Sequence, residues 1–135
     1  MTARYLLDTN FCIALIRKLS ERAERKVVEH DVAEIAISAL TVAELEYGVA
    51  QSRKPEVNRE KLDLFLQPLQ ILAFDDAVAL AYGAARAKLA ASGKVIGPID
   101  MLLAGQALGL DMTLVTNSTR EFGRVAGLRV EDWTR

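Results

Sequence analysis

The chain has 135 residues, of which 51% are hydrophobic and 26% are charged, and its formal net charge at pH 7 is -1. This length suits one domain with a sizeable core, and this composition excludes an intrinsically disordered chain. The nearly neutral charge excludes a strong overall basic field, so any nucleic-acid binding needs a local basic patch or a metal between the protein and the phosphates.

Short apolar runs alternate with longer segments of helical character along the chain. The expected strands, in chain order, are residues 4–7, 35–38, 69–74, 112–115 and 128–130. Two of the expected helices begin near residues 10 and 41. The other expected helices cover residues 21–30, 59–66, 77–91, 99–108 and 121–125. This alternation predicts an α/β fold with a mainly parallel central sheet of about four or five strands and helices on both faces.

Polar residues mark several of the expected helix starts. Ser20 is expected to cap the helix of residues 21–30, and Thr41 is expected to cap the next helix in a capping box with Glu44. Asp75 and Asp76 stand before the longest helix, where acidic side chains favour the helix dipole. We interpret these two acids as structural.

Three other carboxylates lie at the end of an expected strand or the start of an expected helix, among small or apolar residues: Asp8, Glu44 and Asp100. Each has a structural alternative, because Asp8 could only cap a helix, Glu44 could only complete a capping box, and Asp100 could only favour a dipole. If they meet, their charges repel, and a hard divalent cation such as Mg²⁺ or Mn²⁺ relieves the repulsion. Carboxylates holding such a metal suit phosphodiester hydrolysis.

Other reactive residue types give weaker signals. Glu121 and the single histidine, His30, are expected to be solvated, and the single cysteine, Cys12, is expected to be a buried apolar residue. Ser38 and Ser118 lack a convincing histidine partner, which argues against a serine hydrolase.

Four stretches, in order, resemble the motifs of PIN-domain proteins. They are Leu6-Leu7-Asp8-Thr9-Asn10, the segment from Ser38 to Gly48, the segment from Gly97 to Ala104, and the segment from Leu114 to Phe122. The ending Leu128-Arg129-Val130-Glu131-Asp132-Trp133 is also similar. The resemblance covers nearly the whole chain and is to the VapC toxins of bacterial type II toxin–antitoxin systems.

The resemblance implies a single PIN domain over residues 1–135 and an Mg²⁺-dependent endoribonuclease, with Mn²⁺ as the alternative ion. It implies that Asp8, Glu44 and Asp100 are the catalytic and metal-holding residues. Many PIN domains carry a fourth acid where this chain has Ser118, so the fourth ligand and the number of metals stay open. The candidates for supporting roles are Thr9, Asn10, Thr116, Asn117 and Glu121.

The resemblance also implies partners: a VapB-type antitoxin in a hetero-oligomer, a second copy in a homodimer, and an RNA substrate. The nearly neutral charge favours a structured RNA such as a tRNA, with the anticodon loop of initiator tRNA suggested by the enteric members. Helices between residues 11 and 66 offer a groove for an amphipathic antitoxin segment, although about half of its apolar residues are expected to be core. The candidates for gripping RNA are Arg17, Lys18, Arg53, Lys54, Arg86 and Lys94.

The expected setting is the reducing cytoplasm, because a single cysteine cannot form an internal disulfide. No membrane span is expected, because the apolar segments are short and interrupted. Two other classes of function stay open. The first is a different acid-metal enzyme, such as a phosphatase or a DNA nuclease, and the second is a non-catalytic binding module whose acids only cap helices.

Overall fold

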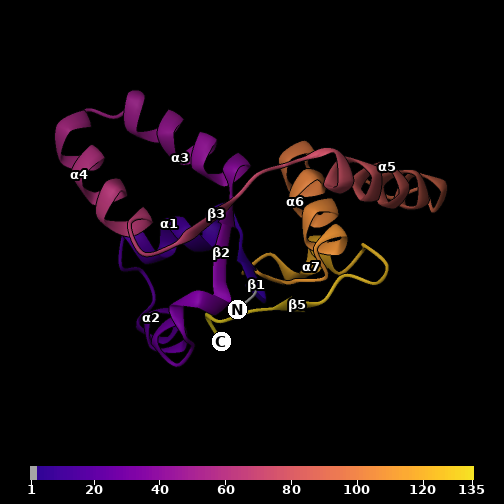
Figure 1. The fold of residues 1–135 in the computed structure, drawn as a ribbon, viewed down its shortest axis with the longest axis horizontal. Coiled ribbons are helices and arrows are strands. Elements are labelled where there is room, and N and C mark those ends of the chain that lie inside the picture. Colours follow the sequence, from indigo (N-terminus) through magenta and orange to yellow (C-terminus); the bar gives the residue numbers. More distant parts are fainter. Residues whose placement is uncertain (1–2) are drawn as a thin grey trace.

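The computed structural model describes residues 3–135 and has one parallel sheet with the strand order β3-β2-β1-β4-β5. The strands are β1 (Tyr5–Leu7), β2 (Ile35–Ser38), β3 (Gln70–Leu72), β4 (Thr113–Val115) and β5 (Val130–Glu131). The helices are α1 (Thr9–Ile16), α2 (Glu21–Val28), α3 (Ala39–Ala50), α4 (Pro55–Leu66), α5 (Asp76–Ala91), α6 (Pro98–Gly109) and α7 (Thr119–Phe122). A short 3-10 turn, η1 (Val32–Glu34), precedes β2. The expected α/β architecture is confirmed, with α3 and α4 on one side of the sheet and α5 and α6 on the other (Figure 1).

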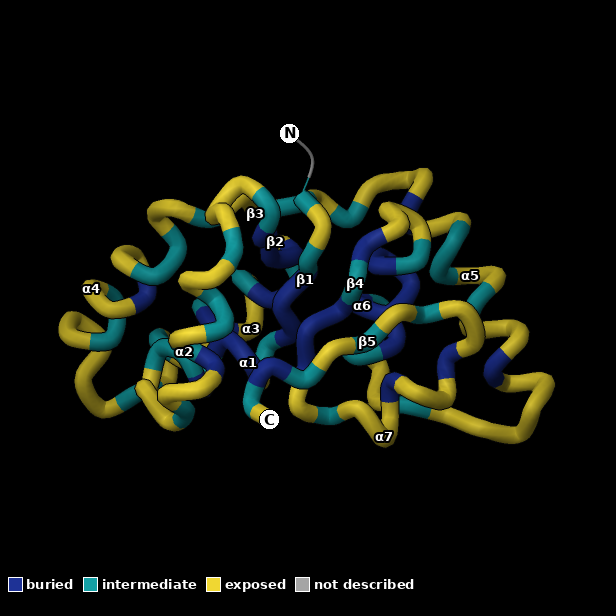
Figure 2. The backbone as a smooth tube through the Cα atoms, turned by 90° about the horizontal axis from the view of Figure 1, so that it is seen from below, coloured by how far each residue is buried: buried dark blue, intermediate teal, exposed yellow. Residues whose placement is uncertain are grey.

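Each face of the sheet has its own hydrophobic core, because alternate residues of a strand point to opposite faces. Leu6 pairs in register with Ala36 and Leu114, and all three pack in the core under α5, α6 and α7. Leu7 pairs with Ile37 and Val115, and these pack against α1 and its neighbours on the other face. The buried backbone accordingly lies in the centre of the molecule, and the outer sides of α4 and α5 are exposed (Figure 2).

Helix capping differs from the sequence prediction at α3. Ser38, and not Thr41, is the N-cap, because its hydroxyl accepts the Leu40 backbone N–H at 3.0 Å. Thr41 and Glu44 therefore lie inside the helix, and the predicted capping box between them is wrong. The predictions for Ser20 and Asp75 are confirmed, since each accepts a backbone N–H at the start of its helix.

Three element boundaries also differ from the prediction. Helix α4 begins at Pro55, four residues before the expected start at residue 59, because Pro55 stands at the first helical position, where the missing N–H costs nothing. The last strand is Val130–Glu131, where residues 128–130 were expected, because β5 forms only where the chain meets β4. Helix α7 begins at Thr119, two residues before the expected start.

The closest helix packing is between α5 and α6 at Gly105. A Cβ atom at this position would lie 2.6 Å from the Tyr82 Cα and 2.7 Å from its Cβ, so no side chain fits without moving the two helices apart. We expect Gly105→Ala to lower the unfolding free energy by about 2–3 kcal/mol. Urea denaturation followed by circular dichroism measures this loss. Gly83→Ala on the open side of α5, where no atom lies within 4 Å, is the matched control and should not destabilise the protein.

Candidate active site

The candidate site lies at the carboxyl end of the sheet, beside the point where the strand order reverses between β1 and β4. Asp8 directly follows β1, and its backbone N–H donates to the Val115 carbonyl of β4 at 2.9 Å. Its side chain also caps α1, because Oδ1 accepts the Phe11 N–H at 2.8 Å. Asp8 therefore caps α1, as its structural alternative predicted. Because only Oδ1 is used in the cap, Oδ2 can bind a second partner.

That second partner is Thr116, the residue after β4. Its hydroxyl donates to Asp8 Oδ2 at 2.5 Å and accepts the Ser118 backbone N–H at 2.9 Å. Both Asp8 and Thr116 are buried. The Thr116 hydroxyl is held by the Ser118 N–H and in turn holds the Asp8 carboxylate in one orientation.

Glu44 reaches the same region from α3. The Thr9 hydroxyl donates to Glu44 Oε1 at 2.9 Å and lies 3.2 Å from the Thr41 hydroxyl. Since Thr9 is the first residue of α1 and directly follows Asp8, this bond ties Glu44 to the start of α1. Glu44 itself is exposed, so its carboxylate can still move.

Asp100 stands in the first turn of α6, next to Glu121 of α7. Partial burial raises the pKa of Asp100, and the charges of Glu121 and Glu44 together with a hydrogen bond to Glu121 raise it further. Glu121 is exposed, as the sequence predicted, but it is also a direct neighbour of the site. The contact with Asp100 makes Glu121 a candidate for the fourth acid of the site.

The acids repel one another across the site. Burial raises the pKa of Asp8 to about 6, although the Thr116 and Phe11 hydrogen bonds oppose the shift, and the charges of Asp100 and Asp132 add to it. Burial is the largest cause of the raised pKa of both Asp8 and Asp100, and the neighbouring negative charges add to it; a cation would offset both effects. The arrangement therefore favours a bound cation.

An open recess of about 500 Å³ lies in front of these residues, and Thr9, Asn10, Glu44 and Asp100 line it. Within residues 3–135, no three Asp, Glu, His or Cys side chains lie close enough together to form a ready-made metal site. The donor set is nonetheless all oxygen, as Mg²⁺ and Mn²⁺ prefer. Asn117 is exposed, two residues after the end of β4.

Asp132 is a neighbour of the site that the sequence did not single out. It follows β5, and its charge reaches Asp8. Its Oδ1 accepts the Thr134 backbone N–H at 2.8 Å and the Thr134 hydroxyl, so the side chain is committed to the C-terminal turn. Only the pairing of β5 with β4 could have revealed it, and a two-residue strand gives little signal.

Two of the weaker candidates take structural positions. Cys12 is buried, as predicted, and burial raises the pKa of its thiol well above the usual value. His30 is half-buried between the rings of Tyr5 and Trp133, at centroid distances of 4.7 and 4.6 Å, so the expectation of a freely solvated histidine is wrong.

Comparisons with known proteins agree with this geometry. A family model described as "PIN domain" matches residues 5–128. The tRNA(fMet)-specific endonuclease VapC of Shigella flexneri is 39% identical over 131 residues, which are 97% of this chain and 98% of the relative. Ribonuclease VapC2 of Rickettsia felis is 39% identical over 134 residues, with the same two coverages.

Solved structures show the same likeness. The crystal structure of DNA-bound VapBC from Salmonella typhimurium superposes with a TM-score of 0.92 at 37% identity, over 98% of this chain and 99% of that one. VapBC2 from Rickettsia felis, bound to a DNA fragment from its promoter, gives a TM-score of 0.89 at 39% identity, over 96% and 98%. The chain therefore belongs to the PIN domain family and, within it, to the VapC ribonucleases.

Proposed function

We propose that this protein is the toxin of a type II toxin–antitoxin system, a divalent-metal-dependent endoribonuclease that hydrolyses phosphodiester bonds in tRNA. The observation that carries the proposal is the convergence of acids from separate segments toward one end of the sheet, where the charge of Asp100 acts on Asp8 and the charges of Glu44 and Glu121 act on Asp100. The likeness to the tRNA(fMet)-specific endonuclease VapC supports the anticodon loop of initiator tRNA as the target. Such a substrate places the protein in the cytoplasm.

The metal is Mg²⁺ in this proposal, with Mn²⁺ able to replace it, and Asp8, Asp100 and Glu44 hold it, assisted by Glu121. When bound, the metal supplies Lewis-acid polarisation of the scissile phosphate and a lowered pKa for the attacking water. The chain itself positions the ligands, because Thr116 holds Asp8 in one orientation and Thr9 ties the more mobile Glu44 to the start of α1. Asn10 and Asn117, exposed at the rim, are proposed to contact substrate or water.

A substrate panel tests the enzyme claim. The protein is incubated with initiator tRNA, a DNA hairpin of the same sequence and a phosphomonoester, each with Mg²⁺ or with EDTA. Cleavage of the tRNA alone, and only with Mg²⁺, is the expected result. Preferential cleavage of the DNA or the phosphomonoester would mean that the protein is a DNA nuclease or a phosphatase. No reaction with any substrate would favour a non-catalytic binding module.

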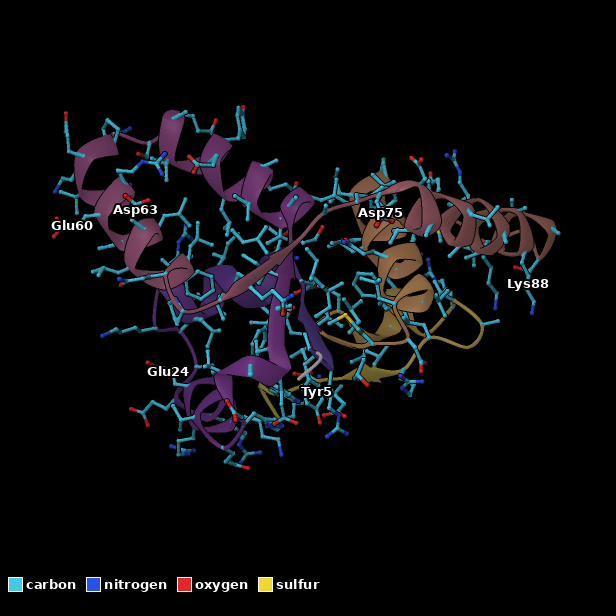
Figure 3. All side chains as sticks on the ribbon, in the orientation of Figure 1. Tyr5, Glu24, Glu60, Asp63, Asp75 and Lys88 are labelled. Carbon is cyan, nitrogen blue, oxygen red and sulfur yellow. The ribbon has the colours of Figure 1, made fainter. Side chains whose placement is uncertain are left out.

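The role of Glu121 has its own test. Because its charge raises the pKa of Asp100, Glu121→Gln is expected to lower that pKa in metal-free protein, and to weaken Mn²⁺ binding roughly tenfold. Carboxyl NMR titration measures the first effect, and calorimetric titration with Mn²⁺ measures the second. Glu60→Gln, an exposed change on α4 far from the site, is the control (Figure 3). Equal Mn²⁺ affinity in both variants would remove Glu121 from the metal site.

The antitoxin partner is supported by the VapBC complexes of the relatives and by a groove of about 290 Å³ between α1, α3 and α4. Its apolar lining is Ile13, Ile16, Leu45, Val49 and Leu62. The apolar residues of this region divide as expected between core and groove: Phe11, Leu45 and Leu62 are buried, and Ile16, Val49 and Phe65 are half-buried. Since Glu44 also lines the groove, an antitoxin segment bound there lies beside the acids.

A homodimer is part of the same proposal. The outer side of α5 and the edge strand β3 carry exposed apolar side chains, with Leu80 80% and Ile71 48% exposed. Light scattering on the purified protein would show twice the chain mass, and a monomer at micromolar concentration would contradict the dimer.

None of the described helices is long and apolar enough to cross a membrane.

A further inference from the structure

A third hollow, separate from the acid recess and the antitoxin groove, lies between the end of α5 and the segment that follows α7. It has a volume of about 170 Å³. Three cations line it: Lys88 on α5, Lys94 in the α5–α6 connection, and Arg124 just after α7. Its floor is apolar, with Leu89 and Val125 buried beneath the cations.

The positive charge of this hollow is not compensated. No acidic residue lines it, and residues 77–99 contain no Asp or Glu at all. Within the described chain, Lys88, Lys94 and Arg124 take part in no ion pair, whereas Arg4, Arg59 and Arg129 each face a carboxylate. All three cations of the hollow are exposed. Three cations around one hollow with no acid among its lining residues create a local positive potential that attracts an anion.

The backbone around the hollow is held in place by side-chain hydrogen bonds. The Arg124 guanidinium donates from Nη1 to the Val95 carbonyl at 3.0 Å, which ties the α5–α6 connection to the end of α7. The Ser92 hydroxyl donates to the Leu89 carbonyl at 2.6 Å, and Gly93, with φ of 77°, makes the turn that a residue with a side chain rarely adopts. Lys94 therefore projects from a fixed turn, and Arg124 keeps further N–H donors for a ligand.

The hollow is close to the candidate active site. The Arg124 backbone N–H donates to the carbonyl of Glu121 at 3.1 Å, so the two residues are one helical turn apart. Glu121 in turn contacts Asp100. Lys94 and Asp100 lie on either side of the Gly97–Pro98 helix start. Helix α7 and the start of α6 therefore link the hollow to the acids, and a ligand that reaches both must be an extended one.

The cations continue beyond the hollow, which favours a polyanion over a single ion. Lys94 also lines a neighbouring hollow of about 200 Å³ together with Arg86 and Tyr82. The Arg86 guanidinium donates to the Tyr82 hydroxyl at 2.8 Å and lies 6.0 Å from its ring centroid, so its position is restrained. Figure 3 shows Lys88 on α5 at one end of the molecule and the acidic Glu60 and Asp63 on α4 at the opposite end.

We propose that Lys88, Lys94 and Arg124 form a phosphate site that binds the backbone of the RNA substrate. The inference rests on the proposed ribonuclease function and deepens it, because it says which surface grips the substrate. Of the six cations considered from the sequence, the site contains Lys94, with Arg86 in the neighbouring hollow, and it adds Lys88 and Arg124. Arg17 lines both the antitoxin groove and the acid recess.

The test measures tRNA binding by Lys88→Gln/Lys94→Gln in EDTA, where no metal-dependent cleavage interferes. Arg124 is left in place, because it also tethers the turn. We expect a dissociation constant about tenfold higher than for the native protein, and a salt slope reduced by about 1.4–1.8, since each phosphate contact contributes about 0.7–0.9. The control is Arg22→Gln/Lys26→Gln, which makes the same charge change on α2.

The outcomes separate this inference from the function on which it rests. If the native protein does not cleave tRNA but the double variant still loses affinity and salt slope, the nuclease proposal fails and the phosphate site stands. If the native protein cleaves tRNA and the double variant binds and cleaves like the α2 control, the phosphate site is overturned. Loss of antitoxin binding with unchanged tRNA affinity, or NMR shifts at the hollow with inorganic phosphate but not with tRNA, would overturn it too.

Discussion

We expect Asp8→Asn to reduce tRNA cleavage by roughly three orders of magnitude or more, and to make the metal-free protein more stable at pH 7. The first effect follows because the amide removes the most deeply buried charge of the proposed metal site. The second follows because that charge is costly in the native state. Loss of activity with a gain of stability distinguishes a functional carboxylate from one that merely caps a helix.

The stability effect has a defined pH dependence. The pKa of Asp8 is raised from an ordinary 3.8 to about 6, so the folded protein binds this proton more tightly than the unfolded chain does. Stability therefore falls as the pH rises from about 4 to 6, and the full penalty, about 3 kcal/mol, is present above that range. In EDTA, the melting temperature of Asp8→Asn should exceed that of the native protein by roughly 5 °C or more at pH 7, and the gap should close near pH 4.

Calorimetry across this pH range makes the measurement, with Asp76→Asn, an exposed change in the first turn of α5, as the control. A variant that cleaves tRNA normally would contradict the role of Asp8. A variant that is less stable than the native protein at pH 7 would show that capping outweighs the cost of the buried charge.

Trp133→Ala should destabilise the protein by about 3–5 kcal/mol, a large part of the stability of a small domain. Trp133 is 2% exposed, and its ring lies 5.1 Å from that of Tyr5 and 6.0 Å from that of Phe11 between centroids. Its indole N–H donates to Glu131 Oε1 at 2.9 Å. Because it packs against both β1 and α1, it supports the two elements that meet at Asp8.

Urea denaturation measures this loss, and Trp133→Phe should recover more than half of it, because most of the ring contacts remain. Leu64→Ala, at a position 65% exposed on α4, is the control and should change stability little. If Trp133→Ala costs less than about 1 kcal/mol, the C-terminal residues are not part of the cooperative core.

The sheet was predictable because each buried strand is a short apolar run followed by a polar residue, as in Leu6-Leu7-Asp8 and Leu114-Val115-Thr116. The alternation of these runs with helical segments then fixed the parallel arrangement. Boundaries were less predictable where two residues could serve as the same cap. Ser38 and Thr41 are both good N-caps, and only the end of β2 decides that Ser38 is used.

The residues of the candidate site also differ in how well the sequence predicted them. Asp8, Glu44 and Asp100 stood out because a carboxylate among apolar or small residues needs a reason. Glu121 was a candidate only through the family resemblance, and Asp132 was not singled out, because both lie in polar stretches and reach the site through α7 and β5. The phosphate site of Lys88, Lys94 and Arg124 joins residues up to 36 positions apart. It follows from the turn at Gly93 and the Arg124 tether, which no local pattern encodes.

The central claim is that a divalent cation binds among these acids, and thermal unfolding with and without millimolar Mg²⁺ or Mn²⁺ tests it most directly. A cation that binds only the native state raises the melting temperature, by an amount equivalent to about 2.7 kcal/mol when its concentration is 100 times the dissociation constant. We expect this rise in the native protein and its loss in Asp100→Asn. An equal rise in both proteins, or no rise in either, would contradict a metal site at Asp8, Glu44 and Asp100.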